Sequence, residues 1–298
     1  MFCFLPFDIA PVTFVTYLKN MKHSFILLLV LLLTTQSKSQ YYFNDFIANK
    51  QSNSQHQLLK TNGIRKVKII NNEADNTVQD GFKLEQEINK DWSEVVTTSS
   101  SSVGSSTLIS NYTKSGIIKT VEVSNGVSNT LDYFYYENGL LQKITSNTID
   151  TSFKRNSTES HEWFYTSNLL PLKMLKIKNN SDTTIVIFVT DEKGLVTEEQ
   201  WSRKGKNIES YFYYYNDQNN ISDIVRYNSK VKKMLPDFIY EYNENGSIKQ
   251  MIQVLAGGSN YNTWVYTYLT NGLKEKEFCY DKQKKLVGAV EYIYNKLN

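Results

Sequence analysis

Cysteine, proline and histidine are scarce in this sequence. Its 298 residues include 2 cysteines, 4 prolines and 3 histidines. A disulfide framework is excluded, because Cys3 lies in an N-terminal stretch that we expect to be removed, and only Cys279 then remains. Beyond that stretch the chain has His56 and His161 alone, which excludes a histidine-rich metal site, and we predict neither a metal nor a cofactor.

Charge of one sign is not in excess either. There are 33 Lys+Arg against 30 Asp+Glu, and removal of residues 1–39 leaves 30 against 29, a net charge of +1. This balance gives no general attraction to nucleic acid, which is therefore not an expected partner. No Gly-x-Ser-x-Gly, Gly-x-Gly-x-x-Gly, Walker or His-Glu-x-x-His motif occurs, so we predict a non-catalytic protein.

The N-terminal segment has the pattern of a secretory signal peptide. A basic start at Met21–His23 precedes nine apolar residues, Phe25–Leu33, and small residues favour cleavage near Ser39–Gln40. As a helix the apolar run spans only about 14 Å, against a hydrocarbon core of about 30 Å. We assign 21–39 as the signal peptide and 1–20 as an extension before the true start. The mature chain is then secreted or periplasmic, without a permanent membrane span, and outer-membrane association stays open.

A short helix followed by strands is expected at the start of the mature chain. Asn44 and Asp45 suit the beginning of a helix over about 44–61, and Asn62-Gly63 suits its end. From 64 to 69 and again around 82–84 the period changes to two, which indicates strands. The run 97–106 consists mostly of Ser and Thr and predicts a flexible loop. Residues 40–106 and 107–298 are read as one domain.

From about residue 107 onward the chain repeats itself. An aromatic strand, a polar turn and a return strand recur in Tyr133–Gly139, Tyr240–Gly246 and Tyr266–Gly272. Tight hairpin turns need a residue with positive φ, which glycine and asparagine adopt most easily. Seven positions share this turn slot at an average spacing of about 26 residues: Gly116, Gly139, Leu169, Gly194, Asn219, Gly246 and Gly272. A second set of turns lies between them, at Asn125-Gly126, Asn179-Asn180, Gly205 and Gly257-Gly258.

Strands that reverse about every 13 residues predict an antiparallel β-meander. About fifteen strands fit between 107 and 295, with two or three more before the Ser-rich run. A sheet of that size cannot remain flat, so we predict an all-β fold curled into an extended open or nearly closed sheet. A four-bladed β-propeller is the alternative, since pairs of repeats recur at about 52 residues.

The pattern Tyr-x-Tyr-Asn/Asp-x-x-Gly-x-Leu/Ile resembles the YD repeats of Rhs-type secreted proteins, and also uncharacterised secreted repeat proteins of Bacteroidota. The resemblance covers roughly 109–295. It implies strand-turn-strand units, which in that family coil into large shells that can enclose a toxin. Here Leu169 and Asn219 replace turn glycines and no toxin sequence follows the last repeat. Only the strand-turn-strand unit therefore carries over.

Two groups of residues are candidates for a binding site. Glu159, His161, Glu162 and Trp163 form the densest polar and aromatic cluster, and Glu159 and His161 on one strand face would share a proton or bind a cation. We favour the alternative that this cluster is a solvated strand end.

The tyrosine rows form the second group. Tyr133, Tyr213, Tyr240 and Tyr266 would form either an exposed platform for a sugar or peptide, or the core of a domain that has no disulfide. We favour the core for most of these rings, because few other large residues are available.

These features favour a secreted or cell-envelope protein with a binding or scaffolding role, whose partner is a glycan or an envelope protein. A glycan hydrolase that uses a pair of carboxylates is the first alternative. An outer-membrane β-barrel is the second, and it ranks lower because the strand 273–280 carries charged residues on both faces.

Overall fold

The computed structural model describes residues 40–75, 77–78, 81–102, 104–228, 231–255 and 260–296. These ranges begin with a turn of π-helix, η1 (Tyr42–Ile47), that continues into α1 (Ala48–Thr61). All other elements are strands: β1 (Lys66–Glu73), β2 (Lys83–Ile88), β3 (Glu94–Ser101), β4 (Gly104–Thr113), β5 (Gly116–Ser124), β6 (Val127–Tyr135), β7 (Leu141–Asp150), β8 (Arg155–Tyr165), β9 (Pro171–Lys178), β10 (Asp182–Thr190), β11 (Val196–Arg203), β12 (Lys206–Tyr215), β13 (Ile221–Asn228), β14 (Lys233–Tyr242), β15 (Ile248–Val254), β16 (Tyr261–Tyr268), β17 (Lys274–Tyr280) and β18 (Leu286–Asn295).

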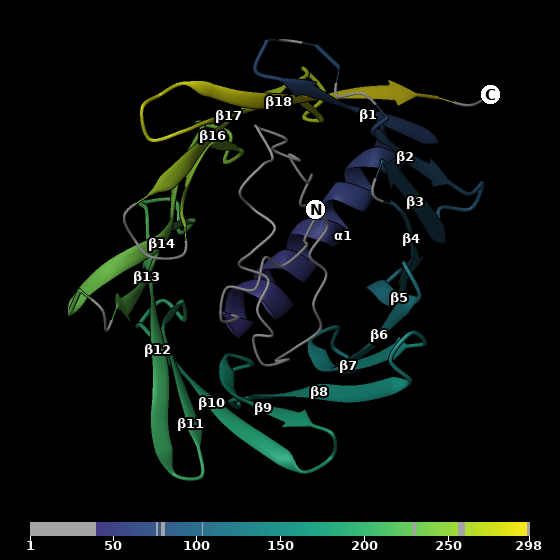
Figure 1. The fold of residues 1–298 in the computed structure, drawn as a ribbon. Helices are drawn as coiled ribbons and strands as arrows, with labels where there is room; N and C mark the ends of the chain where they lie inside the picture. The colour runs from purple at the N-terminus through teal and green to yellow at the C-terminus, as the bar shows by residue number, and fades with distance from the viewer. Residues whose placement is uncertain are drawn as a thin grey trace.

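The strands form one closed antiparallel barrel (Figure 1). Each strand pairs with the next one along the chain, and β18 returns to pair with β1 in a register that runs from Lys66↔Asn295 to Glu73↔Gly288. The predicted all-β meander with a short N-terminal helix is confirmed. The propeller alternative is wrong, because all 18 strands belong to one continuous hydrogen-bonded sheet and do not divide into four-stranded blades.

The predicted turn slots adopt the backbone conformation that the repeat requires. All seven residues of the first set have positive φ, including Leu169 at 62° and Asn219 at 60°, where a side chain occupies the glycine position. The second set behaves in the same way at Asn125-Gly126, Asn179-Asn180 and Gly205, whereas Gly257-Gly258 lies outside the described residues. The period that is visible in the sequence is therefore the period of the hairpins.

The Ser- and Thr-rich run was predicted incorrectly. Residues 97–106 are not a flexible loop, because they lie mostly in β3 and β4, which pair directly through Thr98↔Thr107. Threonine packs well on a pleated surface, and β2 and β5 supply ladder partners on both sides. The predicted cap is also wrong in detail: the helical segment begins at Tyr42, before Asn44, and the residue that precedes it, Tyr41, makes no side-chain capping bond.

In six of the hairpins, a tyrosine at or next to the end of the second strand ties the open end together. For example, Tyr242 is the last residue of β14, and its hydroxyl donates a hydrogen bond of 2.7 Å to the carbonyl of Ile221 at the start of β13. The same bond recurs at 2.7–2.8 Å in Tyr135→Ile117, Tyr165→Leu141, Tyr215→Val196, Tyr268→Ile248 and Tyr294→Lys274. The second tyrosine of the repeated motif thus has a structural role at one rim of the barrel.

Replacing Tyr242 by phenylalanine is expected to lower the free energy of unfolding by about 1–2 kcal/mol. The ring remains, but the carbonyl of Ile221 loses its donor. Urea denaturation followed by circular dichroism measures the change. Tyr214→Phe is the matched control, because Tyr214 is 53% exposed on the outer face and its substitution should have little effect. Equal losses in the two variants would contradict a role for the rim bond.

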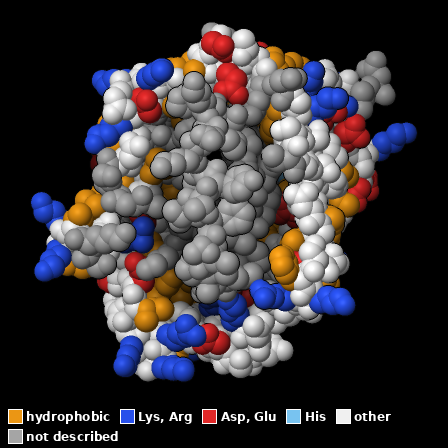
Figure 2. Space-filling view, in the orientation of Figure 1, with side chains coloured by type: hydrophobic (Ala, Val, Ile, Leu, Met, Phe, Trp, Pro, Cys, Tyr) orange, Lys and Arg blue, Asp and Glu red, His pale blue; other side chains and the backbone are white. Residues whose placement is uncertain are grey.

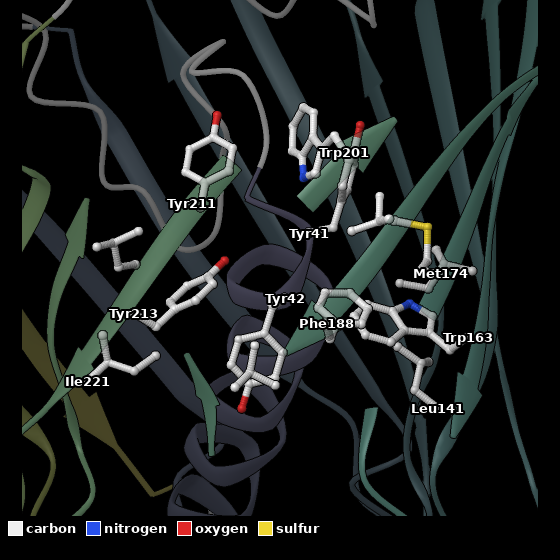
Figure 3. Close-up of a cluster of buried hydrophobic side chains, with 14 of the residues drawn as sticks. Tyr41, Tyr42, Leu141, Trp163, Met174, Phe188, Trp201, Tyr211, Tyr213 and Ile221 are labelled. Carbon is white, nitrogen blue, oxygen red and sulfur yellow. The ribbon is translucent and has the colours of Figure 1, made fainter. Parts of the chain in front are cut away.

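The helical segment lies inside the barrel (Figure 1). An 18-stranded barrel has a lumen too wide for its own inward side chains to fill, so an additional element is needed to build a core. Figure 3 shows Tyr41 and Tyr42 directed toward side chains of the surrounding strands. Tyr42 packs edge-on against Tyr213 at 5.3 Å between ring centroids, and Trp163 stacks on Phe188 at 5.0 Å.

Two buried clusters result from this arrangement. The larger one surrounds η1 and contains Trp163, Met174 and Val186 at 0–1% exposure. The smaller one surrounds the end of α1 at Leu59 and joins the first strands to the last, since it contains both Val67 of β1 and Val290 of β18. Burial of these apolar surfaces, at about 25 cal/mol per Å², is the main force that holds the helix in place.

Candidate functional site in the barrel lumen

Glu199 holds the start of the helical segment. Its Oε1 accepts hydrogen bonds from the backbone N–H of Tyr41 at 2.9 Å and from Trp201 Nε1 at 2.6 Å. Its Oε2 accepts from the backbone N–H of Tyr42 at 3.0 Å and from the Tyr213 hydroxyl at 2.6 Å. The first N–H groups of a helix have no partner within the helix, so a fully buried carboxylate from β11 satisfies them.

Burial raises the pKa of Glu199 to about 7, because the four hydrogen bonds offset only part of the desolvation of the charged form. The pKa of Tyr213 is raised well above its usual range by burial and by the adjacent Glu199 charge. Tyr213 therefore keeps its proton and remains a donor to Glu199. Together these groups form a polar anchor within the aromatic core.

A second anchor joins Asp45 of η1 to β8. Asp45 Oδ2 lies 2.6 Å from His161 Nδ1 and accepts a hydrogen bond from Trp163 Nε1 at 3.3 Å. The other ring nitrogen of His161, Nε2, lies 2.8 Å from Glu159 Oε1. Glu159 Oε2 is in turn 3.3 Å from Lys176 Nζ on β9. The helical segment is thus fixed at two points, one at its first residues and one at Asp45.

His161 carries a positive charge at neutral pH. Desolvation lowers its pKa, but the charges and hydrogen bonds of Asp45 and Glu159 outweigh that effect and raise the pKa to about 9. Two carboxylates then face one imidazolium and one ammonium, which leaves the cluster close to neutral. A buried ionic group is tolerated only when it is paired in this way.

The structure separates the four predicted residues of the first candidate group. Glu159, His161 and Trp163 point into the lumen and are buried, at 6%, 8% and 1% exposure, so they are not a solvated strand end. Glu162 faces the opposite way and pairs with Lys143 on the outer surface at 2.8 Å. The prediction from strand alternation that Glu159 and His161 share one face of the strand is confirmed, and that face is the inner one.

The tyrosines of the second group face the lumen. Tyr213 and Tyr240 are buried at 2% and 7% exposure, which confirms the expectation of a core position for these two rings. Tyr133 is half-buried against the larger cluster. Tyr266 is also half-buried, with Lys274 Nζ 4.9 Å from its ring centre. The four rings do not form an exposed platform.

Asp45 and Glu199 were not singled out from the sequence. Both become important only because η1 lies against β8 and β11, which are more than a hundred residues away along the chain. Glu199 does have a weak local signal, because it shares a strand face with Trp201 in a barrel whose inner face is otherwise mainly apolar.

A pocket of about 600 Å³ lies between α1 and one rim of the barrel. One wall is a stripe of α1 that includes Asn49, Asn53 and Gln57. The opposite wall comes from Tyr135 at the end of β6 and from Leu140 in the β6–β7 turn. The pocket has the size of typical small-ligand sites, which occupy about 300–1,000 Å³.

The described residues do not assemble a metal centre or a pair of catalytic acids in this pocket. No group of three or more His, Cys, Asp or Glu side chains among them is arranged to hold a metal ion. Asp45 is the only carboxylate among the described residues that line the pocket, and its Oδ2 contacts His161 and Trp163. Glycoside hydrolysis ordinarily needs two carboxyl groups facing one cleft.

The outer face of the barrel carries charges of both signs, visible around its edge in Figure 2. Several of them pair between neighbouring strands, at separations of 2.8–3.9 Å: Lys119–Asp132, Lys143–Glu162 and Lys276–Glu291. Threonine and serine occupy further outward positions, such as Thr98 and Thr107 on β3 and β4. The outer face is therefore mixed in polarity.

Within the described part of the chain, no helix is both long enough and apolar enough to cross a bilayer.

Comparisons with known proteins show similarity only at the level of solved structures. No protein-family model and no curated protein matches the chain, so the resemblance to Rhs-type proteins stays a prediction. The chain is similar to a porin-like protein from Bacteroides uniformis, with 9% identity and a TM-score of 0.38 over 78% of this chain and 98% of that one. A porin-like protein from Bacteroides vulgatus matches with 13% identity and a TM-score of 0.29, over 78% of this chain and 99% of that one. The TcdB2–TccC3 complex matches with 13% identity and a TM-score of 0.33, over 72% of this chain and 11% of that one.

Proposed function

We propose that this protein is a plugged β-barrel of the cell envelope that acts by binding a ligand and does not conduct solutes. The observation that carries the proposal is the occupied lumen. Two buried polar anchors, at Glu199 and at His161, hold the N-terminal helical segment across it. A conducting barrel needs a continuous water-filled path, whereas here Tyr41, Tyr42 and Asp45 are buried among strand residues.

A closed barrel fits the outer-membrane alternative better than it fits an open binding sheet. A soluble barrel and a membrane-inserted barrel differ in whether the outer face contacts water or lipid. The surface ion pairs support contact with water. A lysine at the middle of a lipid-facing strand costs about 2–4 kcal/mol, and Lys119, Lys143 and Lys276 all point outward. We infer that the barrel is soluble within the envelope or is peripherally associated with the outer membrane.

An inserted barrel is the second candidate, and one observation favours it. The outward residues of β10, Ile185, Ile187 and Val189, are 37–40% exposed and form an apolar strip. Leu172 on the adjoining β9 is 44% exposed. A lipid-facing barrel would need such a strip to continue around most strands, as an apolar band about 25 Å tall.

Cell fractionation distinguishes the two candidates. The full chain, expressed in a bacterium with two membranes, is expected in the soluble periplasmic fraction or to leave the membranes after a carbonate wash. In planar bilayers it is expected to produce no conductance steps. A resident outer-membrane barrel and a periplasmic enzyme serve as fractionation controls. Retention in the membrane until detergent is added, together with heat-dependent gel mobility, would favour the inserted barrel and contradict the proposal.

A further inference from the structure

We propose that the pocket between α1 and the rim formed by β5, β6 and β7 binds a neutral, hydroxyl-rich ligand of the saccharide class. This inference deepens the proposed binding function and rests on it. Four properties of the pocket carry it: its shape, its pre-positioned amides, its lack of a buried unpaired charge and its mixture of polar and hydrocarbon surface.

The shape suits an elongated ligand. Lining residues recur along α1 at the helical period, from Asn49 and Asn53 through Gln57 to Thr61, so the pocket runs parallel to the helix axis. The 14 residues of α1 extend about 21 Å. A pocket of about 600 Å³ stretched along this length is a groove, which fits a short linear chain of rings better than a single compact molecule.

Two carboxamides in the groove are held in fixed positions by a closed ring of hydrogen bonds. The backbone N–H of Ile117 donates to Asn53 Oδ1 at 2.8 Å, and Asn53 Nδ2 donates to Asn49 Oδ1 at 2.7 Å. Asn49 Nδ2 donates to the Tyr135 hydroxyl at 3.1 Å, and that hydroxyl donates back to the carbonyl of Ile117 at 2.7 Å. Asn49 Nδ2 carries a second hydrogen that this ring does not use, whereas the Asn53 side chain also interacts with the Tyr135 hydroxyl.

Gly116 makes this ring possible. A Cβ at this position would lie 2.5 Å from Asn53 Nδ2, so the close approach of α1 to the start of β5 requires glycine. Fixed donors of this kind lower the entropic cost of binding, because the side chains are already ordered before a ligand arrives.

The charge of the groove favours a neutral ligand. The carboxylate of Asp45 is engaged by His161 and Trp163, and Lys50 is exposed to solvent. Besides these two groups, the polar lining consists of amides and hydroxyls, which include Gln57 and Ser54. A cation would find no carboxylate among the described lining residues except the engaged Asp45, and an anion would meet only the solvent-exposed Lys50, where an ion pair contributes little to binding. Sugar hydroxyls, in contrast, accept from amide N–H groups and donate to hydroxyl oxygens.

Hydrocarbon surface completes the match. Phe46, Leu58, Leu140 and Leu141 line the same groove as the amides. A sugar ring presents hydroxyls at its edge and C–H groups on its faces, so it needs both kinds of surface at once. Small-ligand sites in general combine a mainly apolar lining with a few placed polar groups.

Isothermal titration calorimetry on the full-length secreted protein tests this inference, with maltohexaose, cellohexaose, xylohexaose and chitohexaose as probes. At least one probe is expected to bind at a single site. Ser54→Trp, which fills the groove from an exposed position on α1, is expected to weaken that binding at least tenfold. Gln51→Trp adds the same ring at an exposed position of α1 outside the groove and is expected to leave binding unchanged.

Thermal melting of both variants shows whether they fold like the parent. The inference is overturned if none of the four probes binds, or if a folded Ser54→Trp protein binds as tightly as the parent. Fractionation tests the proposed function separately. If the barrel needs detergent for release but binds a probe, the proposed soluble or peripheral location is wrong and the assignment of the groove as a saccharide site is retained. A soluble, non-conducting barrel that binds no probe would overturn the groove assignment alone.

Discussion

Glutamine in place of Glu199 is expected to lower the free energy of unfolding by about 2–5 kcal/mol. All four partners of this carboxylate are donors: two backbone N–H groups, the Trp201 indole and the Tyr213 hydroxyl. An amide nitrogen cannot accept a hydrogen bond, so two of these donors lose their acceptor within a dry core. A buried donor left unpaired costs about 1–3 kcal/mol.

Urea denaturation measures the loss, and limited proteolysis shows where it acts. Because Glu199 holds the first residues of the helical segment, the variant should be cut at Lys50 and Lys60 of α1 faster than the parent protein. Glu198→Gln is the matched control, since the neighbouring side chain faces the other side of β11 and its loss should cost no more than about 0.5 kcal/mol. A Glu199→Gln protein as stable as this control would show that the anchor is not needed.

The turns and strands of this fold are predictable from the sequence because their determinants are local. Leu169 and Asn219 could be assigned to turn slots despite the missing glycine, because the spacing of the neighbouring repeats fixed their positions. The Ser- and Thr-rich strands β3 and β4 were missed for the opposite reason. Their composition is neutral on its own, and their pairing depends on β2 and β5.

Closure of the barrel has no local signal. The pairing of Val67 with Tyr294 joins β1 to β18 across almost the whole described chain, and nothing in either strand specifies the other. Strand number indicated only that the sheet must curl. The last pairing also depends on the helix, because Leu59 packs into the cluster that contains Val67 and Val290.

The position of the helix could not be predicted either. Its sequence is rich in Asn, Gln and Ser, which is typical of a helix at the surface. In the structure much of this polar stripe lines the groove, while Ala48 and Leu59 face the core. Strand alternation likewise predicts that Glu159 and His161 share one face of a strand. It does not predict that this face is buried, because the helical segment that carries Asp45, the partner of His161, lies 116 residues away along the chain. Sequence periodicity identifies faces, and only tertiary contact decides which face is dry.

Glutamine in place of His161 is expected to cost about 3–5 kcal/mol at neutral pH. The imidazolium sits between Asp45 and Glu159. Its removal leaves these buried carboxylates, within the described part of the chain, with their contacts to Lys176 and Trp163. Breaking a buried ion pair by removing one member is far more costly than breaking a surface pair. Glu162→Gln, on the same strand, breaks the exposed pair with Lys143 and should cost at most about 1 kcal/mol.

The pH dependence identifies His161 as the source of this loss. Its pKa rises from 6.5 in the unfolded chain to about 9 in the fold, so the folded state binds the proton more tightly. The resulting stabilisation, about 3 kcal/mol, is fully present below pH 6.5 and disappears as the pH rises through 9. Urea denaturation between pH 6 and 10 should therefore show the parent losing stability over this window relative to the His161→Gln variant. A constant difference between the two proteins across the window would mean that His161 supports the helix through packing and not through its charge.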